Sequence, residues 1–176
     1  MEQMFAIMAD NPAAAVAGFI ALVCFAVWPL FRGRWTMLMT YIGNNLGFAL
    51  HYALLGHWTA AAMNGLMSVQ TVVAILLDRQ PGLRWAYYAL MPVLALACVA
   101  TWQGPPSYLA AAATTLSTIG RMQTNDVVLR VILLASTPFW GVHDLLVGSA
   151  PGLIADGLSI ATGATMLLRH SPTVVT

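Results

Sequence analysis

The sequence predicts an all-α membrane protein with seven transmembrane helices, arranged as two parallel three-helix repeats joined by a linker helix. Its composition, the length of its apolar segments and a recurring pattern of polar residues predict this class. Hydrophobic residues make up 60% of the 176 residues and charged residues 7%, whereas a soluble domain carries about 25% charged residues. Because so few polar side chains are available to cover a surface, we expect lipid to cover most of it.

The apolar segments have the length of membrane-spanning helices, which need roughly 20 residues to cross a bilayer. Polar or Pro/Gly breaks divide the chain into seven segments. We expect these at 12–31, 35–56, 58–78, 82–101, 105–121, 125–147 and 150–169. Because the breaks between them are short, consecutive helices are expected to be antiparallel neighbours.

All the arginines are expected on one side of the membrane. They follow or end the first, third, fifth and seventh segments, or begin the sixth: Arg32, Arg34, Arg79, Arg84, Arg121, Arg130 and Arg169. The positive-inside rule makes that side cytoplasmic, with the N-terminus outside and the C-terminus inside. Glu2 and Asp10 stand where a signal peptide would carry basic residues, so we expect the first span to be retained.

A pattern recurs after 92 residues: His51 falls on His143, Gly56 on Gly148, and the tripeptide 64–66 (NGL) on 156–158 (DGL). This offset carries the second and third segments onto the sixth and seventh. Both units therefore cross the membrane in the same direction, as parallel repeats. The expected divisions are a first repeat at 1–78, a linker helix at 79–104 and a second repeat at 105–176.

Polar and aromatic residues occupy matching faces of the two repeats. A carboxyl group near the middle of a spanning helix costs about 2.5–3.5 kcal/mol on insertion scales, so Asp156 is expected to face a cavity or the bundle interior. We expect a substrate cavity between the repeats, lined by Asn44, Phe48, His51, Asn64, Trp140, His143 and Asp156. Asp156 and His143 are the candidates for taking up a proton.

Several of these residues also have a purely structural interpretation. His51 and His143 could equally be hydrogen-bonded between helices, away from any cavity. Asp144 lies near the outer end of its segment, where it could reach headgroups or water. Since adjacent helical residues point about 100° apart, His143 and Asp144 are not expected to work as a dyad. Cys24 and Cys98 fall in different spans, as apolar fillers.

Residues 47–66 (GFALHYALLGHWTAAAMNGL) and 137–159 (TPFWGVHDLLVGSAPGLIADGLS) carry a resemblance to a known family. In both stretches His is followed by Leu and Gly, and the next helix brings a polar residue before Gly. The chain resembles the YgjV-type inner-membrane proteins of bacteria, which are related by fold to the SWEET, SemiSWEET and PQ-loop transporters. This resemblance implies a multi-pass protein of the bacterial inner membrane with a SWEET-like arrangement of helices.

The sugar-transporting relatives carry an aromatic residue on the second helix of each repeat and an Asn on the third. Phe48 and Asn64 resemble that pair, as do Trp140 and Asp156 at the same spacing. Asp156 departs from the expected Asn, which favours a cationic or proton-coupled substrate over a neutral sugar. No clear Pro-Gln pair is present in the second segment, so the resemblance does not extend to the gating mechanism.

The leading functional hypothesis is a small-solute carrier that works by alternating access, with proton coupling as an option. The alternatives are a redox protein in which His51 and His143 ligate haem or a metal, and a ligand receptor or assembly factor of the same fold. The sequence lacks nucleophile–base signatures, so no enzyme is expected, and its lack of a basic run argues against nucleic acid. We expect no resident cofactor or metal. The expected partners are a small-molecule substrate and membrane lipid, and a homo-oligomer is compatible with the sequence.

Overall fold

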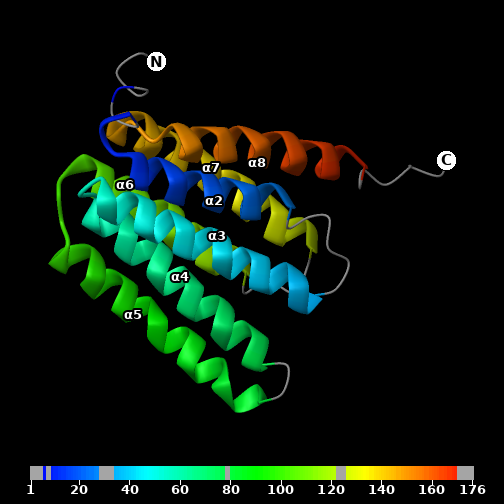
Figure 1. Ribbon diagram of the computed structural model, residues 1–176. Helices are drawn as coiled ribbons and strands as arrows, with labels where there is room; N and C mark the ends of the chain where they lie inside the picture. Colours follow the sequence, from blue (N-terminus) through cyan, green and yellow to red (C-terminus); the bar gives the residue numbers. More distant parts are fainter. Residues whose placement is uncertain (1–5, 7–8, 28–33, 78–79, 122–125, 170–176) are drawn as a thin grey trace.

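The computed structural model describes residues 6, 9–27, 34–77, 80–121 and 126–169 (Figure 1). Within these ranges the chain forms seven long α-helices and no strand, which confirms the all-helical class. The helices are α2 (Pro12–Val27), α3 (Arg34–Leu54), α4 (Trp58–Leu77), α5 (Arg84–Ala100), α6 (Pro105–Arg121), α7 (Asp126–Val147) and α8 (Ala150–Arg169). A short 3-10 helix, η2 (Pro81–Leu83), precedes α5. The observed bounds agree with the expected segments to within two residues, except that 28–31 lie outside the described residues.

Six of the helices form a closed ring. Around it, α2 packs against α3, α3 against α4, α4 against α6, α6 against α7, α7 against α8, and α8 returns to α2. The remaining long helix, α5, lies outside the ring and packs on α4 and α6 (Figure 1). The centre of the bundle is therefore surrounded by helices from both ends of the sequence.

The bundle has two chemically different ends. At one end, which we call the glycine end, the turns contain Gly56, Gly104 and Gly148 with φ of 80°, 97° and 74°. The opposite arginine end holds the helix termini at Arg34, Arg84, Arg121 and Arg169. Arg130 lies in the second turn of α7 at this same end, whereas Arg32 and Arg79 lie outside the described residues.

Helices α3 and α7 end with the same local geometry. The amide of His57 donates to the carbonyl of Tyr52 at 2.8 Å, and the amide of Ser149 donates to the carbonyl of Asp144 at 2.9 Å. A hydrogen bond from an amide to the carbonyl five residues earlier requires a residue in the left-handed conformation within the turn. Glycine adopts that conformation without strain, which explains Gly56 at this position. The two helices therefore deliver the residues that follow them, His57 and Ser149, to matching places at the glycine end.

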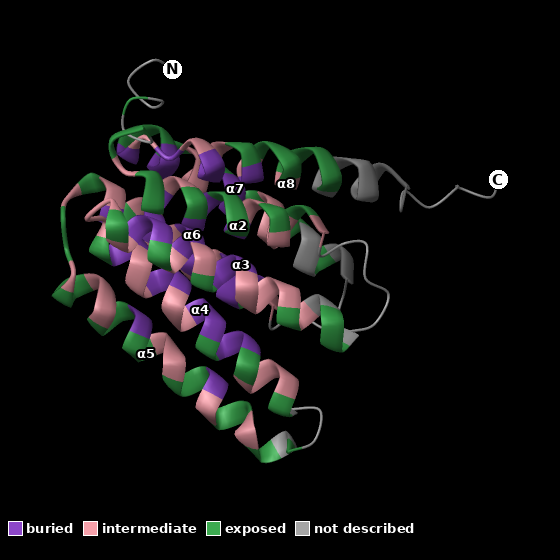
Figure 2. Ribbon diagram, in the orientation of Figure 1, coloured by how far each residue is buried: buried purple, intermediate pink, exposed green. Residues whose placement is uncertain are grey.

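Exposed residues lie on the outer faces of the helices, and buried residues lie toward the centre of the bundle (Figure 2). The exposed residues include many large apolar side chains, whereas many polar side chains are buried. Leu96 and Val99 on α5 are 69% and 76% exposed. Asn45, Gln70 and Thr118 are at most 1% exposed. This distribution is the reverse of a water-soluble fold, and it suits a bundle whose outer surface faces hydrocarbon.

Judged by length and composition alone, one of the described helices qualifies as a membrane span: Trp58–Leu76, with a mean hydropathy of 1.5. Three shorter apolar helices, Pro12–Val27, Arg84–Ala100 and Val131–Val147, fall below that length. Several polar residues of the other ring helices are buried, among them Asn44, Asn45, Thr114, Ser117 and Ser136.

Gly56→Ala is expected to lower the free energy of unfolding by about 1–2 kcal/mol, since a left-handed conformation costs an L-residue that much. An added Cβ would meet no atom within 4 Å, so the loss reports the backbone alone. Gly65→Ala, equally uncrowded but inside α4, is the control, and it should raise stability by up to about 1 kcal/mol. Thermal unfolding in detergent measures both, and shifts of equal sign and size would contradict this explanation.

Candidate binding cavity

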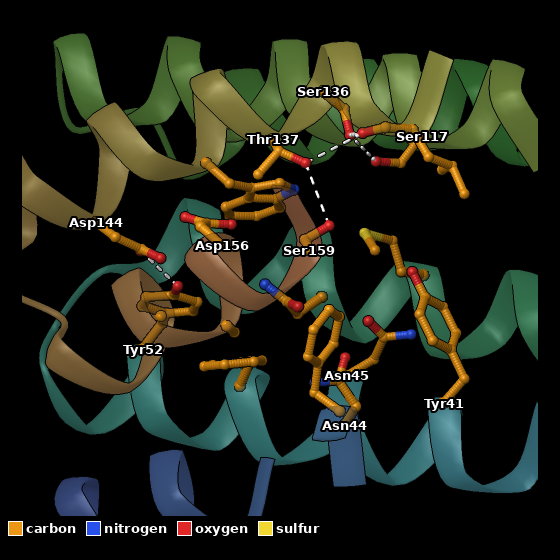
Figure 3. Close-up of a pocket in the computed structure, with 18 of the residues that line it drawn as sticks. Tyr41, Asn44, Asn45, Tyr52, Ser117, Ser136, Thr137, Asp144, Asp156 and Ser159 are labelled. Atoms are coloured by element: carbon orange, nitrogen blue, oxygen red, sulfur yellow. Dashed lines mark hydrogen bonds between the residues drawn. The ribbon is translucent and has the colours of Figure 1, made fainter. Parts of the chain in front are cut away.

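A cavity of ≈ 150 Å³ lies inside the ring (Figure 3). All six ring helices contribute to its lining, from Phe25 on α2 and Ser117 on α6 to Ser159 on α8. Along α3 the lining runs from Tyr41 to Tyr52, a rise of about 16 Å at roughly 1.5 Å per residue. Its volume is similar to that of a protein cavity that holds one benzene molecule.

Five of the seven predicted site residues line this cavity: Asn44, Phe48, Asn64, Trp140 and Asp156. The structure places His51 and His143 outside the lining, at the glycine end. The lining also includes residues that were not among the predicted site residues, chiefly Tyr41, Asn45, Tyr52, Thr137 and Asp144.

Three aromatic rings stack along one side of the cavity. The ring of Tyr52 lies between the other two, 5.8 Å from the Phe48 centroid and 6.3 Å from the Trp140 centroid, with interplanar angles of 21° and 10°. We call Phe48, Tyr52 and Trp140 the aromatic wall. Aromatic faces carry negative potential, so a wall of this kind attracts a cation at short range.

Two carboxyl groups lie at the end of the cavity nearest the glycine end. Asp144 is 2% exposed, and its Oδ1 accepts a hydrogen bond from the Tyr52 hydroxyl at 2.6 Å. The Asp156 side chain lines the cavity beside Asp144 (Figure 3). Asp156 Oδ2 is buried and has no hydrogen-bond partner in the described part of the chain. A buried acceptor without a donor is costly, so this oxygen is the natural place for a bound cation or a proton.

The amide side chains in the lining are held in fixed orientations. Asn44 Nδ2 donates to the Ala21 carbonyl on α2 at 3.1 Å, and Asn64 Nδ2 donates to the Ala60 carbonyl one turn earlier at 3.0 Å. Asn45 differs, because its buried Nδ2 has no partner among the described residues. The lining therefore offers an unpaired donor as well as an unpaired acceptor.

His51 acts as a hydrogen-bonded link between helices. Its Nδ1 lies 2.7 Å from the Ala14 carbonyl on α2, and its Nε2 lies 2.9 Å from Ser149 Oγ at the start of α8. Since both ring nitrogens are engaged, a haem iron could be ligated only by breaking one of these bonds. Within the described residues, no three His, Cys, Asp or Glu side chains are grouped as a metal site would require.

His143 and Asp144 do interact, contrary to the expectation from their positions on the helix. His143 Nδ1 lies 2.9 Å from Asp144 Oδ1. The expectation was wrong because it considered only the Cα–Cβ directions, and rotation about the side-chain bonds closes the angle between them. The expectation that Asp144 reaches headgroups or water was also wrong. Gly152 on α8 packs so closely over Asp144 that a Cβ there would collide with the carboxyl group.

The cavity is closed at the glycine end by five buried polar side chains from both ends of the chain, each at most 2% exposed. We call this group the polar layer: His51, Tyr52, His143, Asp144 and Ser149. Two of its hydrogen bonds, His51 to Ser149 and Tyr52 to Asp144, join α3 to the α7–α8 region. Opening the cavity toward this end requires breaking them.

A second cavity, of ≈ 200 Å³, lies on the other side of the polar layer. Its lining includes Gly56, His57, Thr59, Gln103, Ser107 and His143. The rings of His57 and His143 are 6.5 Å apart. Burial, and to a smaller extent the neighbouring His143, lowers the pKa of His57, so this imidazole is neutral at physiological pH.

At the other side of the central cavity, Arg121 joins three ring helices. Its guanidinium donates to the Tyr41 hydroxyl on α3 at 3.2 Å and to Gln70 Oε1 on α4 at 3.3 Å, and it also lies 5.6 Å from the centre of the Tyr41 ring. Because Tyr41 lines the cavity, these bonds hold the cavity wall on the arginine side.

An apolar outer surface around a closed polar centre is the design of a helical membrane protein with an internal binding site. Residues 12–173 match the family model Imp-YgjV, described as a bacterial inner membrane protein. The chain therefore belongs to this family, which confirms the resemblance to YgjV-type proteins noted from residues 47–66 and 137–159. The relationship to the SWEET-type transporters stays a prediction. No curated protein and no solved structure matches the chain.

Tyr52→Phe is expected to lower the free energy of unfolding by about 1–3 kcal/mol, because Asp144 loses a buried hydrogen bond to a hydroxyl donor. Tyr108→Phe is the matched control, since Tyr108 is 64% exposed. Its effect should stay within about 0.5 kcal/mol. Both shifts can be measured by denaturation in detergent. Equal stability of the two variants would show that the hydrogen bond to Asp144 does not hold the polar layer together.

Proposed function

We propose that this inner membrane protein is a small-solute carrier that works by alternating access. The two moving halves are α2–α4 and α6–α8, and the solute binds in the cavity between them. The observation that carries this proposal is the cavity lined by all six ring helices, with Asp156, whose buried Oδ2 has no partner among the described residues, in its lining.

The helix contacts support a division into two equivalent halves. An offset of 92 residues relates α2 to α6, α3 to α7 and α4 to α8. The contact of α2 with α8 then corresponds to the contact of α6 with α4, and both are present. Individual residues follow the same rule, because the His51–Ser149 bond corresponds to the His143–His57 ring pair. This agreement supports parallel repeats, with α5 as the linker helix outside them.

The described conformation has one closed end, as alternating access requires of any single state. The polar layer separates the central cavity from the glycine end. The Tyr52–Asp144 hydrogen bond connects α3 of one half with α7 of the other. It would therefore break when the halves separate at the glycine end, and corresponding contacts at the arginine end would form or tighten.

The lining favours a small organic cation as the solute. The aromatic wall offers π faces, and Asp156 offers a carboxylate oxygen that no donor satisfies. No lysine or arginine lines the described cavity. Aromatic rings combined with a carboxylate are a common recognition site for ammonium groups. The cavity volume limits the solute to about the size of benzene.

The proposed placement in the membrane is multi-pass, with the arginine end cytoplasmic and the N-terminus outside. Single cysteines introduced by Gln103→Cys at the glycine end and Gln80→Cys near the arginine end form a matched pair, because both glutamines are exposed. In a background with Cys24→Ala and Cys98→Ala, a membrane-impermeant maleimide should label position 103 in spheroplasts. Position 80 should react only after the membrane is permeabilised. The opposite pattern would reverse the orientation, and labelling of both positions would contradict the odd number of spans.

The carrier proposal predicts uptake of a small organic cation into proteoliposomes. Choline is a suitable probe because its permanent charge prevents passive diffusion, and dimethylbutanol, in which carbon replaces the quaternary nitrogen, is its neutral counterpart for binding. Asp156→Asn should weaken choline binding roughly thirtyfold or more, the cost of removing one partner of a buried charge pair. Asn64→Ala should weaken it less, because Asn64 contributes a dipole and no charge.

Asp10→Asn is the control, since Asp10 is an exposed acid near the glycine end and does not line the cavity. Its binding and uptake should match those of the unmodified protein. The panel also includes tetramethylammonium and benzylamine, so that the result does not depend on one shape of cation. If none of the three cations binds, or if Asp156→Asn binds them as well as the unmodified protein does, the proposed site is wrong.

A further inference from the structure

We propose that His143 and Asp144 conduct protons between the glycine-end cavity and the central cavity, so that the carrier exchanges its cation for a proton. This inference rests on the proposed function and adds the coupling ion and its path. The observation behind it is that two separate cavities meet at these two adjacent side chains. His143 lines the glycine-end cavity, Asp144 lines the central one, and a 2.9 Å contact joins them.

The pair forms a continuous connection through a layer that is otherwise closed. His143 is 1% exposed and Asp144 is 2% exposed. Nδ1 of the imidazole is used for the contact with Asp144, which leaves Nε2 as the nitrogen that can exchange a proton with water in the glycine-end cavity. On the other side, Asp144 lines the central cavity together with Asp156 (Figure 3). Three side chains thus lead from one cavity to the unpartnered oxygen in the other.

The transfer step balances without any further reactant. A hydronium ion in the glycine-end cavity gives a proton to Nε2 of His143 and becomes water, while the proton on Nδ1 passes to the Asp144 carboxylate. The imidazole is neutral before and after, and only its tautomer has changed. A second transfer, directly or through water in the central cavity, moves the proton from Asp144 to Asp156. Rotation of the imidazole by about 180° about its Cβ–Cγ bond then brings the protonated Nε2 toward Asp144 and the unprotonated Nδ1 toward the glycine-end cavity, which resets the histidine. The net result is one proton moved from the glycine-end cavity to the carboxyl pair.

The surroundings of the two carboxyl groups, Asp144 and Asp156, explain why a proton and a cation would compete for this site. Two carboxylates this close in a dry site repel each other, so a positive charge must neutralise one of them. Tyr52 donates one hydrogen bond to Asp144 but brings no charge. No basic residue lines the described cavity. The empty site therefore holds a proton, and a bound organic cation takes over its role.

The other titratable groups that face the pair are few. From α3 come His51 and Tyr52, whose rings flank each other at 5.1 Å, and the Tyr52 ring lies 5.2 Å from that of His143. The turn after α3 brings His57, 6.5 Å from His143, and α8 brings Asp156. The lining residues of both cavities from α4 and α6 are uncharged: Thr59, Ala60, Asn64, Met67, Ser107 and Ser117 among them.

The first experiment measures proton release by the purified protein in weakly buffered detergent solution with a pH-sensitive dye. Choline carries no proton that it could lose at this pH, so any proton that appears on binding comes from the protein. We expect about one proton released for each choline bound, by the linkage between proton and ligand. Asp156→Asn should release none. Choline binding without proton release overturns the exchange mechanism but leaves the binding site intact, whereas absence of binding by all three cations overturns both proposals.

The second experiment separates the proton path from the binding site. In proteoliposomes with an acidic interior, the unmodified protein should accumulate choline against its gradient. His143→Gln keeps the size of the side chain but cannot relay a proton, so gradient-driven accumulation should be lost while choline–choline exchange continues. His57→Gln removes the other imidazole of the same cavity and should retain both activities. Loss of exchange together with accumulation in His143→Gln, or equal loss in both variants, overturns the assigned path.

If His143→Gln does not fold, the unmodified protein still tests the proposal. Choline added outside acid-loaded proteoliposomes should drive protons outward, as reported by a dye trapped inside. An internal pH that does not respond to choline uptake overturns the exchange mechanism.

Discussion

The hydrogen bond between Tyr52 and Asp144 joins α3 to α7 across the centre of the ring, and the arrangement of the cavity lining depends on it. A carboxyl group this deeply buried needs donors close by. Asp144 obtains them from another helix and from its own neighbour His143. Tyr52, which donates a hydrogen bond to Asp144, is also the middle ring of the aromatic wall. One residue therefore both closes the glycine end and shapes the lining of the cavity.

The ring of six helices resolves a conflict in the composition. A chain with this many apolar residues still carries Asn, Gln, Ser, Thr and Asp side chains on helices that would have to cross hydrocarbon. The ring turns those faces inward, where the polar groups bond to one another, as Thr118 does with Gln70 and Ser117 with Ser136. Each unpaired polar atom that remains then has an energetic cost. Six such buried atoms are found in the described part of the chain, and two of them belong to Asn45 and Asp156, which line the cavity. The requirement to satisfy buried polar groups thus both builds the bundle and marks the place where a ligand would stabilise it.

Much of the fold could be predicted from the sequence, because helix length and breaks are local properties. Pro12, Gly56, Pro105 and Gly148 stand at or next to helix ends, where the backbone itself requires them. The offset of 92 residues also placed Tyr52 in register with Asp144, although the hydrogen bond between them was not foreseen. Their helices meet only after the ring has closed. Sequence spacing likewise gave no reason to separate His51, which bonds to Ala14, from the cavity residues on the same helix face. Which of several residues on one face reaches a cavity depends on the tilt and depth of the neighbouring helices, and no pattern within a single helix encodes these.

Helices α2–α4 meet helices α6–α8 along two interfaces, α4–α6 and α2–α8, which we call seams. The position of α5 makes these two seams unequal. Along the α4–α6 seam, α5 packs on both helices and also carries the chain from one half to the other. The α2–α8 seam has no such strap among the described helices, and Gly18 on α2 lies so close to Pro151 on α8 that an added Cβ would collide with the proline ring. Because α5 holds α4 and α6 together, the two groups of helices would separate more easily at the α2–α8 seam. The α4–α6 seam would then act as the hinge of the proposed movement. In the proposed carrier, a solute would then enter and leave past α2 and α8, the first and last long helices that the structure describes.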